Sequence, residues 1–514
     1  MKLKVRILGL SAGRKPVVIL NEDDAREIGV RGSSRVEISY GNKKIVGIVN
    51  LSKSLVKKGE IGFSEEVERR LKVKENESIE VNEAPFPVSV EYIREKLRGR
   101  RLSKEKIYQI VKDVVKGNLS EIEITGFVVA LHSYGLSLEE AANLSLAMVK
   151  TGEVLKLDRK YILDKHSIGG AFGDKTSIIL VPIIASLGYT IPKTSSRAIT
   201  SAAGTADKVE VLTNVELELE EMKRVVEKTN GCLIWGGALH LAPADDIFIQ
   251  VEYPLGIDPL LFPSIMSKKK AVGATHLVID IPTGRGTKVK TIGDATLLAK
   301  DFIELGRMLG IKVNVAITYG EQPIGYTIGP ALEAKEALEI LMRKKIVDDQ
   351  LDKVLELAGI LLSMVGRKDG KELAYKAWKS GKAEKKLREI IEEQGGNGKI
   401  KPEDIPIGRY KLDVYAKEDG KVFWIDSKKL VEIARMAGAP KEKGSGILIY
   451  KKIGDKVKKG QKIFSVFAEH ENKLDRIEKI VEESRIFGIG KKAEMLISKV
   501  KDGFEHKKQF ILER

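Results

Sequence analysis

Short apolar runs alternate with amphipathic segments through the middle of the chain. Five runs rich in branched and aromatic residues predict buried strands, at 161–163, 189–193, 232–235, 276–281 and 313–316. The segments between these runs carry apolar residues at helical spacing, and strands separated by helices favour a parallel sheet. We therefore expect an α/β domain over residues 156–402, whose later helices could also pack with a neighbouring helical domain.

The flanking regions follow different patterns. Residues 86–155 have helical periodicity, with capping signals at Ser103, Ser120 and Ser137, and they predict a helical domain. Residues 403–514 change to a mostly β pattern, which predicts a small C-terminal domain rich in strands. The expected fold class is therefore a multidomain α/β protein with a mostly parallel central sheet.

The first 84 residues contain an internal repeat. The segment from Asn21 to Ile38 aligns with the segment from Ser64 to Val81, and each copy predicts a capped short helix followed by an alternating strand. Two copies in one small unit resemble a double-psi β-barrel. We expect a barrel over residues 1–84, closed by an extended proline-containing linker that begins at Ala84.

Composition excludes several classes of protein. Lys and Arg number 89 against 73 Asp and Glu, for a net charge of +16, but both signs are interspersed, as on the solvated surface of a thermophile protein. No aromatic–basic interleaving indicates nucleic-acid binding. One cysteine, Cys232, and no long apolar run indicate a cytoplasmic protein without membrane association. The six histidines lack metal-ligand spacing, so we expect no metal.

Three glycine- or hydroxyl-rich loops follow predicted strands. The loop from Ser195 to Glu210 combines hydroxyls, small residues and the start of a helix, which together suit a phosphate-like anion. The loop from Asp164 to Ser177 has the same character and carries Lys165 and His166. A third, from Gly284 to Lys290, is cationic. Since ligands bind outside the carboxyl ends of parallel strands, we expect the three loops to form one pocket for a doubly phosphorylated ligand.

A separate segment of interest begins at Asp258. This carboxylate stands where a predicted helix begins, and Ser264 and Lys268 follow it. A carboxylate at a helix start is often a simple cap, and lysines in a last helical turn are often solvated. The residues alone leave both the structural and the functional interpretation open.

In three motifs the chain resembles the thymidine/pyrimidine-nucleoside phosphorylase family, over about residues 86–490. The motifs are Asp164-Lys165-His166-Ser167-x-Gly169-Gly170, Ser195-x-Arg197-x7-Thr205-x-Asp207-Lys208-x-Glu210, and Ser264-Ile265-Met266-Ser267-Lys268-Lys269. They are long and correctly ordered, and hence specific. The additional N-terminal domain is similar to that of one branch, the archaeal AMP phosphorylases.

The resemblance implies phosphorolysis, in which inorganic phosphate attacks the anomeric carbon of the ribose and the base leaves. In this branch the substrate would be a nucleoside 5′-monophosphate, AMP first, with CMP and UMP as further candidates. The products from AMP would be adenine and ribose 1,5-bisphosphate. The alternative within the family is a pyrimidine-nucleoside phosphorylase acting on uridine or thymidine. The family also implies a homo-oligomer, a dimer or larger, that needs no cofactor.

The resemblance further implies roles for individual residues. The attacking phosphate would be held by Lys165, Ser167, Ser177, Ser195 and Thr205. The nucleotide would be lined by Gly170, Ser196, Arg197, Ala198, Ile199, Thr200, Ser201, Thr205 and Lys290. At the catalytic centre, His166, Ser264 and Lys268 match base-contacting positions, and Asp258 would protonate the leaving base.

The sequence departs from the nucleoside enzymes in ways that favour another substrate. Ser196 replaces the glycine of their Ser-Gly-Arg motif, and their base-binding arginine falls near Glu252 or Tyr253. Two other classes compete less well. An anthranilate-type phosphoribosyltransferase needs Mg²⁺ and a pyrophosphate sugar, but the chain offers no further acidic metal cluster. A scaffold built on the terminal β domains would not need Lys165 and Thr205 together.

Overall fold

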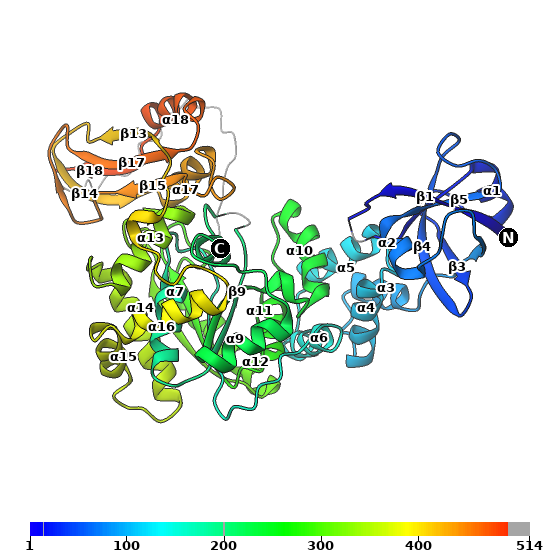
Figure 1. The fold of residues 1–514 in the computed structure, drawn as a ribbon, viewed down its shortest axis with the longest axis horizontal. Helices are drawn as coiled ribbons and strands as arrows, with labels where there is room; N and C mark the ends of the chain where they lie inside the picture. The colour runs from blue at the N-terminus through cyan, green and yellow to red at the C-terminus, as the bar shows by residue number, and fades with distance from the viewer. Residues whose placement is uncertain (14, 199–200, 492–514) are drawn as a thin grey trace. The chain divides into compact units, whose positions relative to one another are not determined.

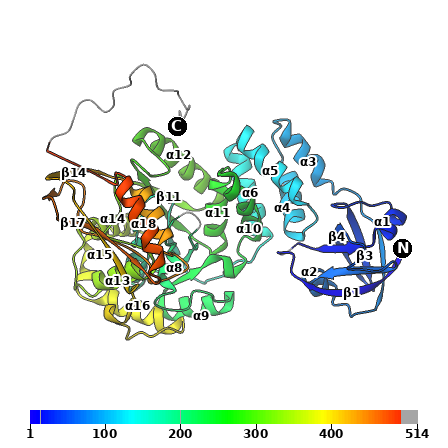
Figure 2. The same cartoon turned by 90° about the horizontal axis from the view of Figure 1, so that it is seen from above.

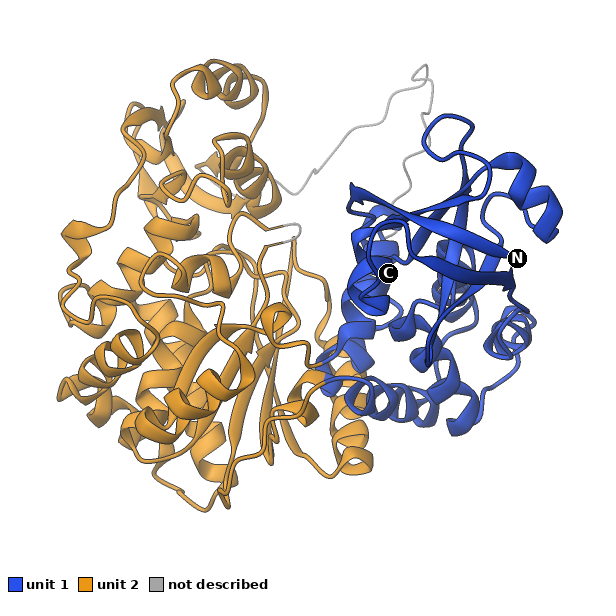
Figure 3. Ribbon diagram, turned by 45° about the vertical axis from the view of Figure 1, so that its right-hand side comes forward, with its two compact units in different colours: residues 1–152, 242–267 blue, residues 153–241, 268–514 orange. Residues whose placement is uncertain are grey.

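The computed structural model describes residues 1–13, 15–198 and 201–491, which form two compact units (Figure 3). Unit 1 comprises Met1–Gly152 and Ala242–Ser267, and unit 2 comprises the rest of the chain. The segment Ala242–Ser267 therefore differs from the expected assignment to the α/β domain. Its Phe248 and Leu260 are buried in the same apolar core as the helices of unit 1, which explains the difference.

Unit 1 begins with a closed six-stranded barrel (Figure 1). The strands are β1 (Lys2–Leu10), β2 (Val17–Leu20), β3 (Arg35–Tyr40), β4 (Lys43–Leu51), β5 (Glu60–Ser64) and β6 (Ser78–Glu83), in the order β1-β5-β2-β4-β3-β6. The two copies of the repeat occupy equivalent places. β1 pairs in parallel with β5 as β4 does with β2, and helix α1 (Glu22–Ile28) corresponds to α2 (Glu65–Leu71). The predicted N-terminal barrel is confirmed.

A helical bundle completes unit 1. Its helices are α3 (Ser89–Leu97), α4 (Lys104–Lys116), α5 (Glu121–Tyr134), α6 (Leu138–Lys150) and α10 (Pro243–Leu255). The three expected caps are present: Ser103 accepts from the backbone of Lys106, and Ser120 and Ser137 form capping boxes. Each cap satisfies N–H groups that the helix leaves unpaired at its start. α11 (Leu261–Ala271) begins in unit 1 and ends in unit 2.

Unit 2 is built on parallel strands, as predicted. β11 (Lys312–Tyr319), β10 (His276–Thr283) and β7 (Leu163–Ser167) form one sheet in that order, and β8 (Ile191–Ser195) pairs with β9 (Gly231–Trp235). A single parallel bridge between Ile162 and Thr190 connects the two groups. α12 (Ile292–Leu309) and α14 (Asp348–Met364) both contact β10 and β11 (Figure 2).

The carboxyl ends of two strands differ from the prediction. β7 continues through Ser167 and β8 through Ser195, although their apolar runs end earlier. The reason is that strand pairing uses backbone groups: Ser167 lies opposite Asp280 on β10, and Ser195 lies opposite Trp235 on β9. Lys165 and His166 are therefore held on a strand and not in a loop.

The core of unit 2 surrounds α7 (Thr176–Ser186), which is apolar and buried along almost its whole length. The later helices α13 (Pro330–Leu341), α14, α15 (Gly370–Lys379) and α16 (Lys382–Glu393) contribute their apolar faces to this core. The sequence allows these helices to pack either in the α/β domain or with the helical domain. Their shared core shows that they belong to the α/β domain. Short α8 (Thr205–Val209) and α9 (Leu219–Thr229) connect β8 to β9.

The C-terminal part of unit 2 is a β-rich domain around its own apolar core. It contains β13 (Tyr410–Tyr415), β14 (Gly420–Ile425), α17 (Ser427–Met436), β15 (Gly446–Ile449), β16 (Lys456–Val457), β17 (Lys462–Ala468), α18 (Asn472–Glu483) and β18 (Phe487–Gly490). β15 pairs with β12 (Thr327–Ile328) from the preceding domain, which extends a four-stranded sheet. Over the described residues, no helix combines the length and apolarity that a membrane span requires.

Candidate active site

A cavity of about 680 Å³ lies in unit 2, at the carboxyl ends of its parallel strands. The ends of β7 and β8, the segments after them and the segment after β10 line it: Lys165–Asp174, Lys193–Arg197 with Ser201–Thr205, and Gly286–Lys288 with Lys290. The three loops singled out in the sequence therefore share one cavity. Gly170 permits their close approach, because a Cβ there would lie 2.6 Å from the backbone nitrogen of Lys288.

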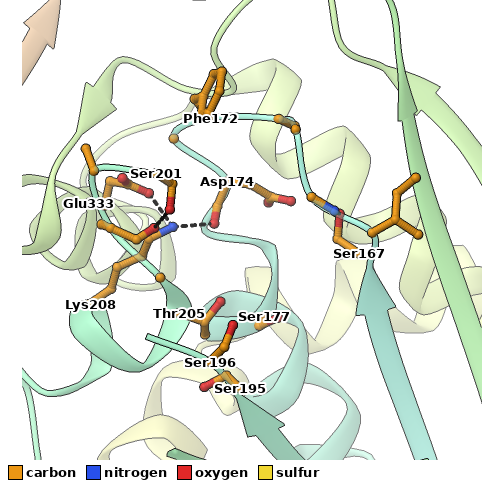
Figure 4. Close-up of a pocket in the computed structure, with 18 of the residues that line it drawn as sticks. Ser167, Phe172, Asp174, Ser177, Ser195, Ser196, Ser201, Thr205, Lys208 and Glu333 are labelled. Atoms are coloured by element: carbon orange, nitrogen blue, oxygen red, sulfur yellow. Dashed lines mark hydrogen bonds and ion pairs between the residues drawn. The ribbon is translucent and has the colours of Figure 1, made fainter. Parts of the chain in front are cut away.

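Most of the sequence-predicted site residues line this cavity. They are Lys165, His166, Ser167, Gly170, Ser177, Ser195, Ser196, Arg197, Ser201, Thr205 and Lys290. Figure 4 shows the hydroxyl groups of Ser177, Ser195, Ser196 and Thr205 close to one another, with Ser167 across the cavity. Such a group of hydroxyls beside backbone N–H groups suits the oxygens of a phosphate.

Four further predicted residues that the structure describes are not among those that line the cavity. Ala198 is outside the cavity lining, although it belongs to the same loop. Ile199 and Thr200 lie outside the described residues. Asp258 and Ser264 belong to unit 1, where Asp258 is exposed and the Ser264 hydroxyl donates to the Asp245 carboxylate at 3.0 Å. Lys268 belongs to unit 2, in the last turns of α11, and is half-buried.

Lys165 lines the cavity and belongs to a network of shared charges. Its Nζ is 3.8 Å from a carboxylate oxygen of Asp174 and 3.8 Å from one of Asp280. Lys353 on α14 is nearer to the same oxygens, at 3.2 and 2.8 Å. Burial lowers the pKa of Lys165, whereas the two carboxylates outweigh burial and raise the pKa of Lys353. Lys353 is therefore the closer partner of both carboxylates, whereas Lys165 also lines the cavity, where it can pair with an added anion.

His166 is a neutral imidazole at neutral pH. Burial, and then the charges of Lys269, Lys193, Lys268 and Lys165, hold its pKa well below the usual value. A neutral imidazole offers one donor and one acceptor. This suits a hydrogen bond to the edge of a base better than a charge contact with phosphate.

Two buried lysines share the buried carboxylate of Asp164, and one of them, Lys193, lines the cavity. The Asp164 carboxylate accepts from Lys269 at 2.7 Å and lies 3.9 Å from the Lys193 ammonium, which also donates to the Thr194 carbonyl at 2.8 Å. Burial, together with Lys269, places the pKa of Lys193 well below its usual value. One buried carboxylate between two lysines leaves the site short of negative charge, which favours an anionic ligand.

Asp207 on α8 connects described parts of the loop from Ser195 to Glu210, which we call the hydroxyl-rich loop. One oxygen of its carboxylate accepts from the backbone N–H groups of Ala198 and Gly204, at 2.7 and 2.8 Å. Gly204 leaves no room for a side chain, because a Cβ would lie 2.5 Å from the carbonyl oxygen of Ser196. The described residues on either side of positions 199–200 are thus connected before a ligand binds, which lowers the entropic cost of binding.

Arg197 is held mainly by the protein itself. Its guanidinium donates to Glu210 at 2.9 and 2.5 Å and to Glu216 at 2.8 Å, and it lies 4.8 Å from the centre of the Trp235 ring. The Arg197 guanidinium holds the pKa of Glu210 at about 2. Arg197 lines the cavity as expected, and its charge is compensated by these carboxylates.

The structure adds residues that were not assigned roles from the sequence. The ammonium of Lys208 donates to the Asp174 carbonyl at 2.9 Å and lies 2.6 Å from the Glu333 carboxylate (Figure 4). Lys208 lies within a recognised motif, so its position could have indicated a role. Glu333 on α13 and Lys428 on α17 come from distant segments without any local motif. Among the residues that the structure describes, no three His, Cys, Asp or Glu side chains are grouped to hold a metal.

Comparisons with known proteins agree with this arrangement. Three family models match: "Glycosyl transferase family, helical bundle domain" at residues 90–152, "Glycosyl transferase family, a/b domain" at 159–384, and "Pyrimidine nucleoside phosphorylase C-terminal domain" at 422–487.

Curated relatives are similar over nearly the whole chain. An AMP phosphorylase of Thermofilum pendens is 49% identical over 100% of both chains. One of Thermococcus kodakarensis is 52% identical over 93% of this chain and 95% of its own. One of Methanocaldococcus jannaschii is 45% identical over 97% of this chain and 99% of its own. Among solved structures, anthranilate phosphoribosyltransferase from Thermus thermophilus shares the fold, with a TM-score of 0.51, 20% identity, and coverage of 59% of this chain and 98% of its own.

Proposed function

The chain belongs to the AMP phosphorylase family, and on that premise we propose that it is a pentosyltransferase that cleaves AMP with inorganic phosphate. The observation that best supports this activity is the single cavity in which three phosphate-suited loops and several lysines meet. The products are adenine and ribose 1,5-bisphosphate. CMP and UMP are further candidate substrates, since they share the ribose 5-phosphate.

The proposed reaction is a direct exchange at the anomeric carbon. A phosphate oxygen forms a bond to C1′ while the glycosidic C–N bond breaks, and the base leaves with a proton on its nitrogen. The transition state is positive on the sugar and negative on the base. A site that fixes the phosphate dianion against the sugar accelerates this step by positioning and by electrostatic stabilisation.

The two phosphate groups of the reactants match cavity lysines of two kinds, one buried and two on the third loop. Lys165 is buried and lines the cavity together with several hydroxyl-bearing residues, and we assign the attacking phosphate to it, with Ser167, Ser177, Ser195 and Thr205. Lys288 is exposed and Lys290 half-buried, both on the third loop. We assign the 5′-phosphate of AMP to these outer lysines, because it lies at the far end of the ribose from C1′.

We assign the base to the remaining family positions. Asp258 is the proposed proton donor, and Ser264 and Lys268 are proposed base contacts, on the resemblance alone. His166 is supported further by its neutral imidazole, whose pKa is lowered and which can donate to or accept from a base. A pyrimidine-nucleoside phosphorylase is the second candidate. Such an enzyme would use the same phosphate loops, but its substrate has no 5′-phosphate and would not need the lysines of the third loop.

We also propose a cytoplasmic homo-oligomer, a dimer or larger. The bundle of unit 1 exposes large apolar side chains on two helices, with Ile122 on α5 75% exposed, and Tyr253 and Leu255 on α10 53% and 52% exposed. Exposed apolar patches of this kind often mark interfaces between proteins. The mass of the purified protein by light scattering tests this proposal.

Lys290→Ala is expected to raise the KM for AMP by about tenfold or more, since a hydrogen bond to a charged group contributes about 1.5–3 kcal/mol. The affinity for adenosine, measured as inhibition of AMP cleavage, should change little, because adenosine lacks the 5′-phosphate. Equal losses with AMP and adenosine would contradict a 5′-phosphate role for Lys290.

The proposed function is tested by identifying the products. Incubation of the enzyme with AMP and phosphate should give adenine and a sugar with two phosphorus signals, one for each phosphate ester, in a phosphorus NMR spectrum. A sugar product with one phosphate, formed only from uridine or thymidine, would favour the second candidate.

A further inference from the structure

We infer that the C-terminal domain takes part in substrate recognition, and that Lys428 on α17 binds the 5′-phosphate of the nucleotide. This inference rests on the proposed function and adds to it a specificity-determining residue from a domain outside the three phosphate loops. Three features support it: the face that α17 presents, the contacts that fix the domain to the hydroxyl-rich loop, and the exposure of the cavity lysines.

One face of α17 lies along the hydroxyl-rich loop. Lys428, Val431 and Arg435 are spaced by three and four residues, so they share one side of the helix. Lys428 and Val431 line the cavity, and the Arg435 guanidinium donates to the backbone carbonyl of Ser201 at 3.1 Å. Val431 is also buried in the same apolar core as Ala202. This face of the helix thus forms a wall of the cavity.

A second set of contacts fixes the domain to the same loop. Lys443 lies in the turn that follows α17. Its ammonium is 2.5 Å from a carboxylate oxygen of Glu210 and 3.6 Å from one of Asp207. These are the carboxylates that brace Arg197 and close the loop. These ion pairs and the hydrogen bond from Arg435 to Ser201 therefore hold α17 against the loop. The face of α17 that lines the cavity is thus in place before a ligand binds.

The lysines of the cavity divide by exposure. Lys165, Lys193 and Lys208 are buried. Lys428 is exposed and belongs to the side of the cavity that α17 forms. An exposed ammonium suits the phosphate that is farthest from the reacting carbon and nearest to solvent. In the proposed reaction that group is the 5′-phosphate.

The chemistry also predicts what Lys428 discriminates. AMP and adenosine differ only by the 5′-phosphate, so a cation that contacts this group stabilises the nucleotide complex without affecting the nucleoside complex. A charge-assisted hydrogen bond to a phosphate is shorter and stronger than a neutral one. Recognition of nucleotides over nucleosides would then depend on the C-terminal domain as well as on Lys288 and Lys290.

The test compares Lys428→Ala with Lys429→Ala in the full-length protein. Lys429 is the neighbouring residue on α17, and its ammonium is held by Glu432 at 2.7 Å, which makes it a matched control. Lys428→Ala should raise the KM for AMP by about 10- to 100-fold, with the KM for phosphate unchanged within a factor of about two. Lys429→Ala should leave both values unchanged. Lys428→Arg should restore much of the affinity for AMP, because arginine also binds phosphate.

Direct binding separates the inference from a general disturbance of the fold. By titration calorimetry, Lys428→Ala should weaken the binding of AMP but not of adenosine. An unchanged KM for AMP, or equal weakening of AMP and adenosine, overturns the inference. Failure of the unmodified protein to release adenine from AMP would instead overturn the proposed function, whatever the variant does.

Discussion

Replacing Lys165 by methionine is expected to lower kcat/KM for phosphate by about 10²–10³-fold, the usual cost of removing one donor that stabilises charge in an active site. Lys165 lines the cavity, and it shares Asp174 and Asp280 with Lys353. Without it, two carboxylates face one lysine, and the excess negative charge repels the phosphate. The kcat and the KM for phosphate, both at saturating AMP, are the quantities to measure.

The control for this variant is Lys300→Met on the exposed side of α12. It makes the same chemical change away from the cavity and should leave both KM values unchanged. The thermal midpoint of each variant separates loss of binding from loss of fold. A Lys165→Met enzyme with an unchanged KM for phosphate and normal turnover would contradict the assignment of Lys165 to the attacking phosphate.

Asp258→Asn is expected to lower kcat by about 10²–10⁴-fold, the typical contribution of a general acid. The amide has nearly the same shape but cannot supply the proton that the leaving base needs. Affinity for AMP should be retained, because the proposed role of Asp258 is in the chemical step. Single-turnover kinetics with saturating AMP and phosphate measure the effect on chemistry directly.

A dependence on the leaving group checks the same role. A substrate whose base leaves without protonation should be cleaved by the Asp258→Asn variant nearly as fast as by the unmodified enzyme. If all substrates lose rate equally, Asp258 acts by positioning and not as an acid. Unchanged turnover with AMP would remove Asp258 from the mechanism.

Much of the fold could be predicted because local signals repeat or are strong. The repeat in the first 84 residues corresponds to α1 and α2, and the capping signals at Ser120 and Ser137 mark real helix starts. The apolar runs predict strand ends at Leu163 and Lys193, but the strands continue to Ser167 and Ser195. An apolar run reports burial, whereas pairing depends on the backbone of the neighbouring strand. Local periodicity could not show that Ala242–Ser267 joins a different core, since it does not identify which core a helix packs against.

The site was predictable only where it is continuous in sequence. Lys165 and Thr205 lie in segments at the ends of strands, so their meeting in one cavity follows from the topology of a parallel sheet. Lys353 and Lys428 come from helices far along the chain, and no motif connects them to the loops. Arg197 has a motif, but its carboxylate partners could not be identified without the folded loop.

Base release from AMP, with and without inorganic phosphate, tests the central claim most directly, with adenosine, uridine and thymidine as parallel substrates. The account predicts adenine release from AMP that depends on phosphate, and little release from adenosine. Release of the base from uridine or thymidine, but not from AMP, would contradict it and identify a nucleoside phosphorylase.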